Sequence, residues 1–569
     1  MRLSGSSISE NKVIDSLKYI SKHENSKSIS DEITIISEKL SKIGYIENQI
    51  LENTKENDSS YNAKLSLGER IKSIHIYIGS KILTPTLSKG EGDEISKKNS
   101  VYTYVLLKEL IGLDKTKDTL VLPYGEIESF LNQTLRKLEQ KGFSLAKLKL
   151  VNIQKQKHTL FAELQFASDQ QRQLNEIVIN YSDNNKKNSF PEGHLTQINR
   201  KYRNSTFNQD VVRKIHDDFE KFRFVSQVKY PEILFTKNFT KVYVYLEKRK
   251  SNTFDGFIGF SNTENNKLSF NGYLDLTLEN TLHIGEQFSL YWKSDGNKQK
   301  TFKASIEIPY LFKSPIGLKA QINIFKQDST FQNTKTAIDL GYFVDYNTRI
   351  YLGYQATESS DIQNTNNALI SDYKNSYATA NLEYSKLDYT TPIFLKKSSL
   401  SFTMGIGKRA TNSLPATADT NSQFYIDLNA MHTFYLNKKN SINISSQNYY
   451  LNSESYIINE LYRFGGINSI RGFTENSLQA NFLTSIISEY RYLLSSGLYL
   501  HSILDYGYFR DQSGNDVKKH SDNLLGLGFG FGLQTKNGLL KLAIANGISK
   551  NQEIKFYNTI VHVSYNVKF

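Results

Sequence analysis

The last nine residues constrain the fold more than any other segment of this chain. Five apolar residues alternate with four polar ones: Val561, Val563, Tyr565, Val567 and Phe569 with His562, Ser564, Asn566 and Lys568 between them. A period of two gives a β-strand one apolar face and one polar face. Such a strand fits between lipid and a wet lumen, although the edge strand of a soluble β-sandwich would alternate in the same way.

The composition favours a transmembrane barrel over membrane helices. The mean hydropathy is -0.47, and no segment reaches the roughly 18 uninterrupted apolar residues that a membrane helix needs. A barrel strand faces lipid only at every second residue, so its mean hydropathy stays low while its alternation is strong. The same alternation returns in residues 288–293 and 424–430, and the 36 Tyr and 33 Phe can supply aromatic girdles at the two membrane interfaces.

Strand-like segments fill the chain from Asn252 to its end. About sixteen of them, separated by polar or glycine-containing turns, leave about 20 residues for each strand with its turn, close to membrane strands of roughly 10 residues plus loops. We therefore expect a 16-stranded antiparallel transmembrane β-barrel over residues 251–569. The segment from Ser453 to Ser477 is long and polar, which is typical of a surface loop.

The first 250 residues follow a different pattern, in which amphipathic helices are joined to short strands. An apolar stripe with helical spacing runs from Ile33 to Ile43 and is followed by Gly44, a residue type common at helix ends. The segment around Gly44 returns around Gly142 and, with arginine at the glycine position, around Arg223. These three copies predict three similar small domains, which we place at residues 1–71, 72–171 and 172–250.

Each copy is followed by two strand-like runs, and each unit opens with a strand of its own. The resulting order is β-α-α-β-β, in which two helices cover one face of a three-stranded sheet. An edge strand of such a sheet can pair with an extended guest chain, or it can be purely structural. Both interpretations stay open for each of the three domains.

A late segment and the order of the domains resemble a known family. Residues 464–473 read FGGINSIRGF, and the motif positions in this segment are Gly465, Gly466, Arg471, Gly472 and Phe473. Together with three β-α-α-β-β units before a C-terminal barrel, this motif resembles the BamA and TamA superfamily of outer-membrane assembly and translocation proteins, whose periplasmic units are called POTRA domains. The layout is closest to TamA-like members, since BamA commonly carries five such units.

The resemblance implies that the loop with this motif folds back into the barrel, where Arg471 meets acidic groups on the inner wall. Glu489, Asp505 and Gly507 match the family's motifs on the strands after the loop. The period-two pattern supports an inward direction for both carboxylates, because apolar side chains alternate with them. A guanidinium can bind carboxylates through a planar two-donor fork. The alternative is a solvated loop arginine with two ordinary lumen carboxylates.

The resemblance also implies a weak seam between the first and last barrel strands, which could open toward a client strand. The first strand is expected near Thr253 to Asn262, and its Gly256 and Gly259 would weaken the pairing. The last strand is expected from Ile560 to the terminal Phe569. Two strand glycines are also common in ordinary barrels.

Several kinds of chemistry have no candidate in this sequence. It has no serine elbow, phosphate-binding loop or His-Glu-x-x-His motif, and no cysteine, which excludes thiol catalysis, disulfides and cysteine-ligated metals. The ten His lack ligand spacing, and we expect no enzyme, no cofactor and no metal. The net charge of +13 is spread over strands and loops, which argues against nucleic acid and favours anionic lipid headgroups or a basic lumen as its use.

Three functions fit these patterns. The first is an assembly or translocation factor of the bacterial outer membrane, whose periplasmic POTRA domains bind client outer-membrane or secreted polypeptides. The second is a two-partner secretion transporter that exports one dedicated protein, and the third is a passive porin or surface barrel. An accessory lipoprotein or inner-membrane partner stays open. Because Met1 begins directly in the first strand without an export signal, we expect a mature or truncated form.

Overall fold

The chain forms two compact units in a computed structural model. Unit 1 comprises Met1–Glu176, Tyr202–Lys214 and Ile233–Val242, and unit 2 comprises Ile177–Lys201, Ile215–Glu232 and Tyr243–Phe569. The structure describes residues 1–57, 59–78, 105, 107–114, 116–167, 170–181, 190–262, 268–295, 299–363, 369–391, 393–411, 419–513, 520–535, 538–550, 552–555 and 559–568.

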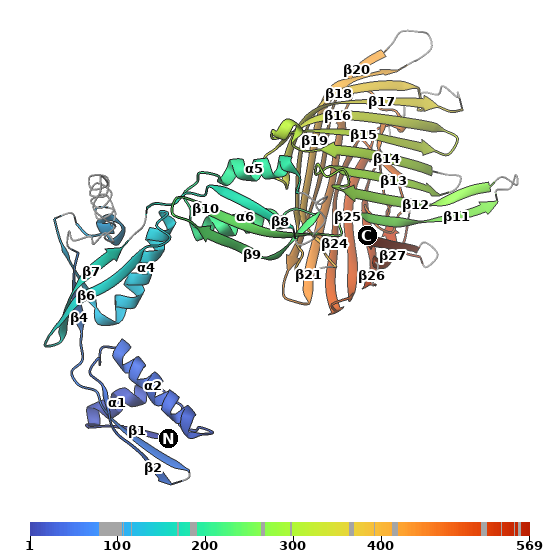
Figure 1. The fold of residues 1–569 in the computed structure, drawn as a ribbon. Helices are drawn as coiled ribbons and strands as arrows, with labels where there is room; N and C mark the ends of the chain where they lie inside the picture. The colour runs from blue at the N-terminus through green and yellow to red at the C-terminus, as the bar shows by residue number, and fades with distance from the viewer. Residues whose placement is uncertain are drawn as a thin grey trace, which may run out of the picture. The chain divides into compact units, whose positions relative to one another are not determined.

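The first sheet has the strand order β1-β3-β2 and the predicted β-α-α-β-β sequence of elements (Figure 1). Its elements are β1 (Arg2–Gly5), α1 (Ile8–Ser16), α2 (Ser26–Lys42), β2 (Gln49–Asn57) and β3 (Ser60–Ser66). The Asn25 side chain caps α2 by accepting from the Ser28 backbone N–H. The buried stripe of α2, formed by Ile33, Ile36 and Leu40, packs with Leu65 of β3.

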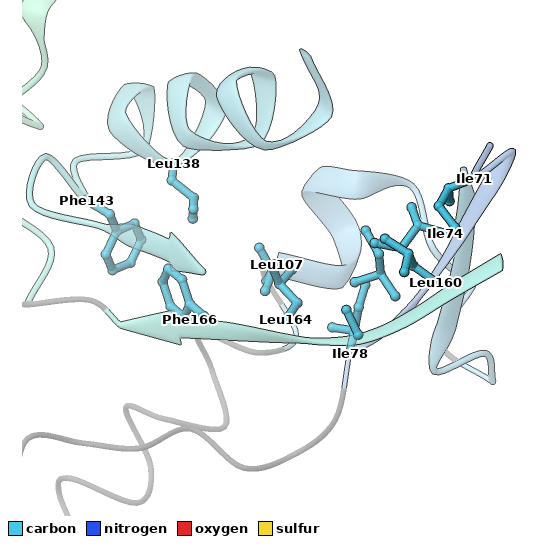
Figure 2. Packing of buried hydrophobic residues seen from close by; sticks show 11 residues of the cluster. Ile71, Ile74, Ile78, Leu107, Leu138, Phe143, Leu160, Leu164 and Phe166 are labelled. Carbon is cyan, nitrogen blue, oxygen red and sulfur yellow. The ribbon is translucent and has the colours of Figure 1, made fainter. Parts of the chain in front are cut away.

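The second sheet has four strands rather than the three expected, in the order β5-β4-β7-β6. Its elements are β4 (Ser73–Tyr77), β5 (Thr119–Pro123), η1 (Tyr124–Glu126), α4 (Ile127–Gln140), β6 (Lys147–Gln156) and β7 (Thr159–Ala167), with helical residues at 107–111. The unexpected strand, β5, pairs with β4 as an edge strand that ends in Pro123, where the missing N–H costs no central hydrogen bond. Leu107, Leu138 and Phe166 belong to the core beneath this sheet (Figure 2).

The third sheet returns to three strands, in the order β8-β10-β9. Its elements are β8 (Glu176–Tyr181), α5 (Glu192–Tyr202), α6 (Gln209–Glu220), β9 (Val225–Phe235) and β10 (Thr240–Lys248). The three sheets therefore agree with three α+β domains before the barrel. No helix in the described ranges is long and apolar enough to cross a membrane.

The chain after residue 250 forms a closed antiparallel barrel, in which sixteen strands are described (Figure 1). Neighbours in sequence are neighbours in the sheet, except that β21 pairs with β24. The strands are β11 (Thr253–Asn262), β12 (Leu268–Glu279), β13 (Gln287–Asp295), β14 (Gln299–Ile308), β15 (Ile316–Gln327), β16 (Phe331–Phe343), β17 (Thr348–Asp361), β18 (Tyr373–Leu387), β19 (Lys396–Thr411), β20 (Asp419–Tyr435), β21 (Asn440–Asn452), β24 (Phe482–Ser495), β25 (Leu498–Asp511), β26 (His520–Gln534), β27 (Gly538–Ile548) and β28 (Ile560–Lys568).

Barrel strands place apolar side chains outward at every second residue. In β16, the side chains of Ile338, Leu340 and Tyr342 are exposed, while Ala337 and Asp339, on the alternate positions, are buried. This direction is the reverse of a soluble protein, in which apolar side chains would fill the interior. The predicted 16-stranded barrel is confirmed. It could be predicted because the alternation is a local property of each strand.

Candidate functional site

The predicted loop motif lies in a hairpin between barrel strands β21 and β24. It follows η3 (Ile458–Glu460) and is enclosed by β22 (Tyr462–Phe464) and β23 (Leu478–Ala480), which pair with each other. Ile470, Arg471 and Phe473 are no more than 4% exposed. The polarity of residues 453–477 predicts a surface loop, and for these three residues that prediction is wrong, because barrel strands supply partners for their side chains.

Arg471 and Asp505 form a two-pronged contact at the base of this loop. The Arg471 Nε donates to Asp505 Oδ2 at 2.8 Å, and its Nη2 donates to Oδ1 at 2.6 Å. The Arg471 backbone N–H adds a third bond to Oδ2 at 3.0 Å. Asp505 is fully buried and Arg471 is 3% exposed, so water screens this pair less than it screens a surface ion pair.

Glu489 extends the contact into a chain of charges. Its Oε1 accepts from Arg471 Nη1, and its Oε2 accepts from Arg491 Nε at 2.8 Å. The backbone oxygen of Ser488 accepts a further bond from Arg471 Nη2. The structure thus brings Arg471 of the loop together with Glu489 of β24 and Asp505 of the neighbouring strand β25.

Apolar side chains of the same loop pack against the inner wall. Phe464 stacks edge-on against Phe509 of β25, with ring centroids 5.4 Å apart. The buried cluster around this contact comprises Phe464, Ile470, Phe473, Ala480, Leu483, Phe509 and Leu524. The loop is therefore held both by charge and by apolar packing.

The motif glycines allow the loop to turn sharply. Gly466 and Gly472 have φ angles of +103° and +88°, a region that side chains disfavour, and neighbouring Gly465 has a φ of +100°. A Cβ atom on Gly472 would also lie 2.4 Å from the Asn546 carbonyl carbon. A side chain at Gly472 would therefore push the loop away from β27.

The wall carries matching glycines where the loop backbone touches it. A Cβ on Gly507 would lie 2.2 Å from Ile470 Cδ1, one on Gly526 would lie 2.3 Å from the Arg471 oxygen, and one on Gly547 would lie 2.5 Å from the Gly472 oxygen. Asp505 pairs with Gly526, which pairs with Gly547, so three adjacent strands contribute to one contact surface. Sequence reasoning named Gly507 but missed Gly526 and Gly547. The signal for Gly526 was the run Leu525 to Gly532, in which glycine occupies every second position, whereas Gly547 lies outside this run.

The barrel closes through a short seam between β11 and β28. On one side, β11 pairs with β12 over its full length, from Thr253 to Asn262. On the other side, the described residues pair with β28 only through Thr253–Lys568, Phe254–Val567 and Asp255–Asn566. β28 pairs with β27 as far as Ile560. Residues 560–565 of β28 therefore lack a strand partner toward β11 within the described chain.

The predicted seam glycines, Gly256 and Gly259, follow Asp255, the last described residue of β11 that pairs with β28. Gly256 pairs with Leu274 of β12, and Gly259 pairs with Asn271 of the same strand. A Cβ on Gly256 would lie 2.5 Å from the Tyr273 oxygen, so the residue allows β11 and β12 to approach closely. A weakening of the seam by these glycines stays a prediction. Phe569 lies outside the described residues.

Exposed sheet edges are present in the N-terminal half of the chain. β2 forms one edge of the first sheet, and its residues Gln49–Asn57 are exposed along the whole strand. Its other side is paired with β3. Among the described strands, β2 is paired only on the β3 side, so its other side can offer backbone groups to an extended polypeptide.

Unit 2 also contains a histidine enclosed by aromatic rings. The His194 ring of α5 lies 4.7 Å from the Tyr310 ring and 5.3 Å from the Phe222 ring, measured between centroids. Neither ring nitrogen has a hydrogen-bond partner within the described chain. Burial, followed by the charge of Arg349, lowers the pKa of His194 to about 3. The ring is therefore neutral at neutral pH.

Comparisons with known proteins agree with this architecture. Residues 280–560 match the Omp85 superfamily domain, and a search of curated proteins found no match. CdiB from Acinetobacter baumannii has a similar fold, with a TM-score of 0.50 and 13% identity over 88% of this chain and 90% of that chain. CdiB from Escherichia coli gives a TM-score of 0.48, with 10% identity over 96% and 100% of the two chains. BamA from Haemophilus ducreyi lacking POTRA domains 1–3 gives 0.44, with 16% identity over 86% and 99%.

Proposed function

From the premise that this chain belongs to the Omp85 superfamily of outer-membrane insertion and translocation proteins, we propose that it receives client polypeptides on its POTRA-like domains and inserts them into the membrane through the barrel seam. Its place is the bacterial outer membrane, with these domains in the periplasm, and it is not an enzyme. The proposed layout is TamA-like, with domains at residues 1–71, 72–171 and 172–250.

The seam is the observation that carries this proposal. Residues 560–565 of β28 have strand partners on the β27 side but none described on the β11 side. Unpaired backbone groups in a membrane are costly, and an incoming strand can satisfy them. A client strand that pairs with β28 would therefore enter the sheet as it enters the bilayer.

The periplasmic sheets supply an earlier docking place for the same client. As the edge strand of the described first sheet, β2 can pair with an extended chain before that chain reaches the barrel. Folded proteins usually shield such edges, since an open edge invites aggregation. An exposed edge is useful in a protein whose clients arrive unfolded.

The docked loop argues against a passive porin. Arg471 and the packed aromatic side chains hold the loop inside the barrel, where it occupies space that a porin leaves to solute. Export of one dedicated protein could use the same seam and lumen. That alternative differs from general assembly in the number of clients, and this number can be measured.

A disulfide across the seam tests the mechanism. The chain has no cysteine, so a pair introduced as Phe254→Cys and Val567→Cys at directly paired positions has no native thiol to compete with it. Oxidation should abolish client insertion, and reductant should restore it. The matched control is Phe288→Cys with Ile306→Cys, a directly paired position between β13 and β14. Full client insertion by the oxidised seam variant would overturn the proposal.

Depletion of the protein distinguishes the breadth of its clients. Outer-membrane and secreted-fraction proteomics should show loss of several barrel proteins if the proposed assembly function holds. Loss of a single secreted or surface protein would instead identify a dedicated transporter. Unchanged protein levels in both fractions would favour a passive barrel.

A further inference from the structure

Two lysines lie in one row across three barrel strands. Lys303 of β14 pairs with Asn323 of β15, and Asn323 pairs with Lys335 of β16. Directly paired residues point to the same face of a sheet, and neighbouring strands are about 4.8 Å apart, so the two lysine Cα atoms are about 10 Å apart. All three residues line one cavity in the barrel lumen, with a volume of about 390 Å³.

These lysines differ from most cations of the lumen. Several lumen cations form ion pairs within 4.0 Å: Lys319 with Glu383, Arg349 with Glu307, Arg409 with Glu460 and Arg491 with Glu489. In the described chain, neither Lys303 nor Lys335 forms an ion pair. The Nζ atom of Lys303 instead lies 5.9 Å from the centroid of the Tyr291 ring, and that of Lys335 lies 5.9 Å from the centroid of the Tyr425 ring. Two like charges on one face repel each other unless an anion lies between them.

A third unpaired cation enters the same cavity from the loop. Arg463 belongs to β22 of the inward hairpin, and its guanidinium carbon lies 5.5 Å from the Phe331 ring centroid. Within the described part of the chain, its Nε atom is buried without a hydrogen-bond partner, as is the Asn323 Oδ1 atom between the two lysines. A rotated Asn323 amide would present its N–H groups at this place.

The carboxylates of the cavity are already engaged elsewhere. Asp427 Oδ1 accepts from Asn429 Nδ2 at 2.6 Å. Glu460 is paired with Arg409 and accepts from Gln423 Nε2 at 2.9 Å. Asp427 and Glu460 are the carboxylates among the described residues that line this cavity, and Arg409 neutralises Glu460. Glu475 also acts on Lys303 but is paired with Lys293, and Asp511 and Asp328 act on Arg463 from outside the lining. The three cations of the lining therefore outnumber its one remaining carboxylate, Asp427.

We propose that this cavity binds an oxyanion, a phosphate or a carboxylate, between Lys303, Lys335 and Arg463. The arginine offers a planar fork of donors and the lysines offer point charges, which together suit an anion with several oxygens. The bound anion joins the β22–β23 hairpin to strands β14 and β16. This inference is independent of the client that the barrel handles, and it gives part of the basic lumen a specific use.

Thermal unfolding of the purified full-length protein in detergent tests the proposal. Inorganic phosphate and acetate are each titrated against chloride at equal ionic strength. A ligand that binds only the folded state raises the unfolding midpoint. We expect phosphate to raise the midpoint of the wild-type protein and its apparent affinity to be about tenfold weaker in Lys335→Gln and in Arg463→Gln, because each variant loses one charged donor. A similar rise with acetate would include carboxylates as ligands, and no rise with acetate would assign the site to phosphate.

The control for general salt effects is Lys438→Gln, which changes an exposed lysine in the turn between β20 and β21. This variant should respond to phosphate as the wild type does. Arg463→Lys should bind more weakly than the wild type, since it keeps the charge and loses the fork. An equal phosphate response in the wild type, Lys335→Gln and Arg463→Gln, or no response in the wild type, would overturn the proposal.

Discussion

The barrel wall near the docked loop and the seam represent two opposite ways of joining strands. At the wall, Arg471 and Asp505 share three hydrogen bonds, and aromatic side chains cover the contact. At the seam, the described pairing of β11 with β28 ends at Asp255. A barrel that must open can have strong side-chain interactions at the wall and a seam whose two strands separate easily.

The largest expected effect comes from removing a charge at the wall. Asp505→Asn leaves the Arg471 guanidinium with one carboxylate in place of two and should lower the free energy of unfolding by about 3–5 kcal/mol. Urea unfolding in detergent, followed by the shift of the folded band in gel electrophoresis, measures this loss. A loss below about 1 kcal/mol, the range of an exposed pair, would mean that the loop is not held by this contact.

Adding a methyl group at the wall should have the next largest effect. A Cβ on Gly526 would meet the Arg471 backbone oxygen at 2.3 Å, so Gly526→Ala should cost about 1–3 kcal/mol as the loop shifts. The matched control is Gly497→Ala, whose Cβ would come no closer than 3.6 Å to a neighbour and should change stability by less than about 0.5 kcal/mol. Equal effects of the two variants would argue against a tight fit of the loop.

A fall in pH should lower the stability of unit 2 through His194, which belongs neither to the wall nor to the seam. The unfolded chain protonates His194 near pH 6.5, whereas burial lowers the pKa of the folded state to about 3. The unfolded state therefore binds more protons between these values, and stability falls as pH falls, by about 1.4 kcal/mol at pH 5.5.

Unfolding at pH 7.5 and 5.5 in the wild type and in His194→Phe checks this expectation. The part of the pH dependence that His194→Phe removes should be the same in an Asp505→Asn background, because the two sites share no partner. A His194→Phe variant that keeps the full pH dependence would assign it to other groups.

The smallest effect is expected at the seam. Asp255 is the last described residue of β11 that pairs with β28, and its side chain accepts from the Tyr273 hydroxyl of β12 on the other side at 2.7 Å. Both side chains are only half-buried, so Asp255→Asn should cost about 0.5–1 kcal/mol. The same urea measurement compares it directly with Asp505→Asn. A loss as large as that of Asp505→Asn would remove the difference between wall and seam.

Features that depend on local alternation could be predicted from the sequence. A strand shows its apolar and polar faces in its own residues, so the barrel and the inward directions of Glu489 and Asp505 follow from the period of two. The helix before Gly44 is local in the same sense. The inward position of the loop was predicted from the resemblance of residues 464–473 to a family motif. The polarity of the segment alone predicted a loop at the surface.

Features that depend on strand register could not be predicted in this way. The row of Lys303, Asn323 and Lys335 exists because three strands pair in one register, and that register is set by turns and backbone pairing rather than by any single strand. The need for glycine at positions 526 and 547 could not be predicted, because it depends on the loop backbone that lies against them in the structure. The strand β5 was missed because it has only five residues and is separated from its partner β4 by a long segment.

The glycine contacts between loop and wall also constrain the order of folding. The oxygens of Arg471 and Gly472 lie so close to β26 and β27 that no side chain fits between them. A loop seated so tightly is difficult to thread into a finished cylinder. We therefore expect the C-terminal strands to gather around the loop before β11 meets β28, and we expect that last contact to separate first on unfolding.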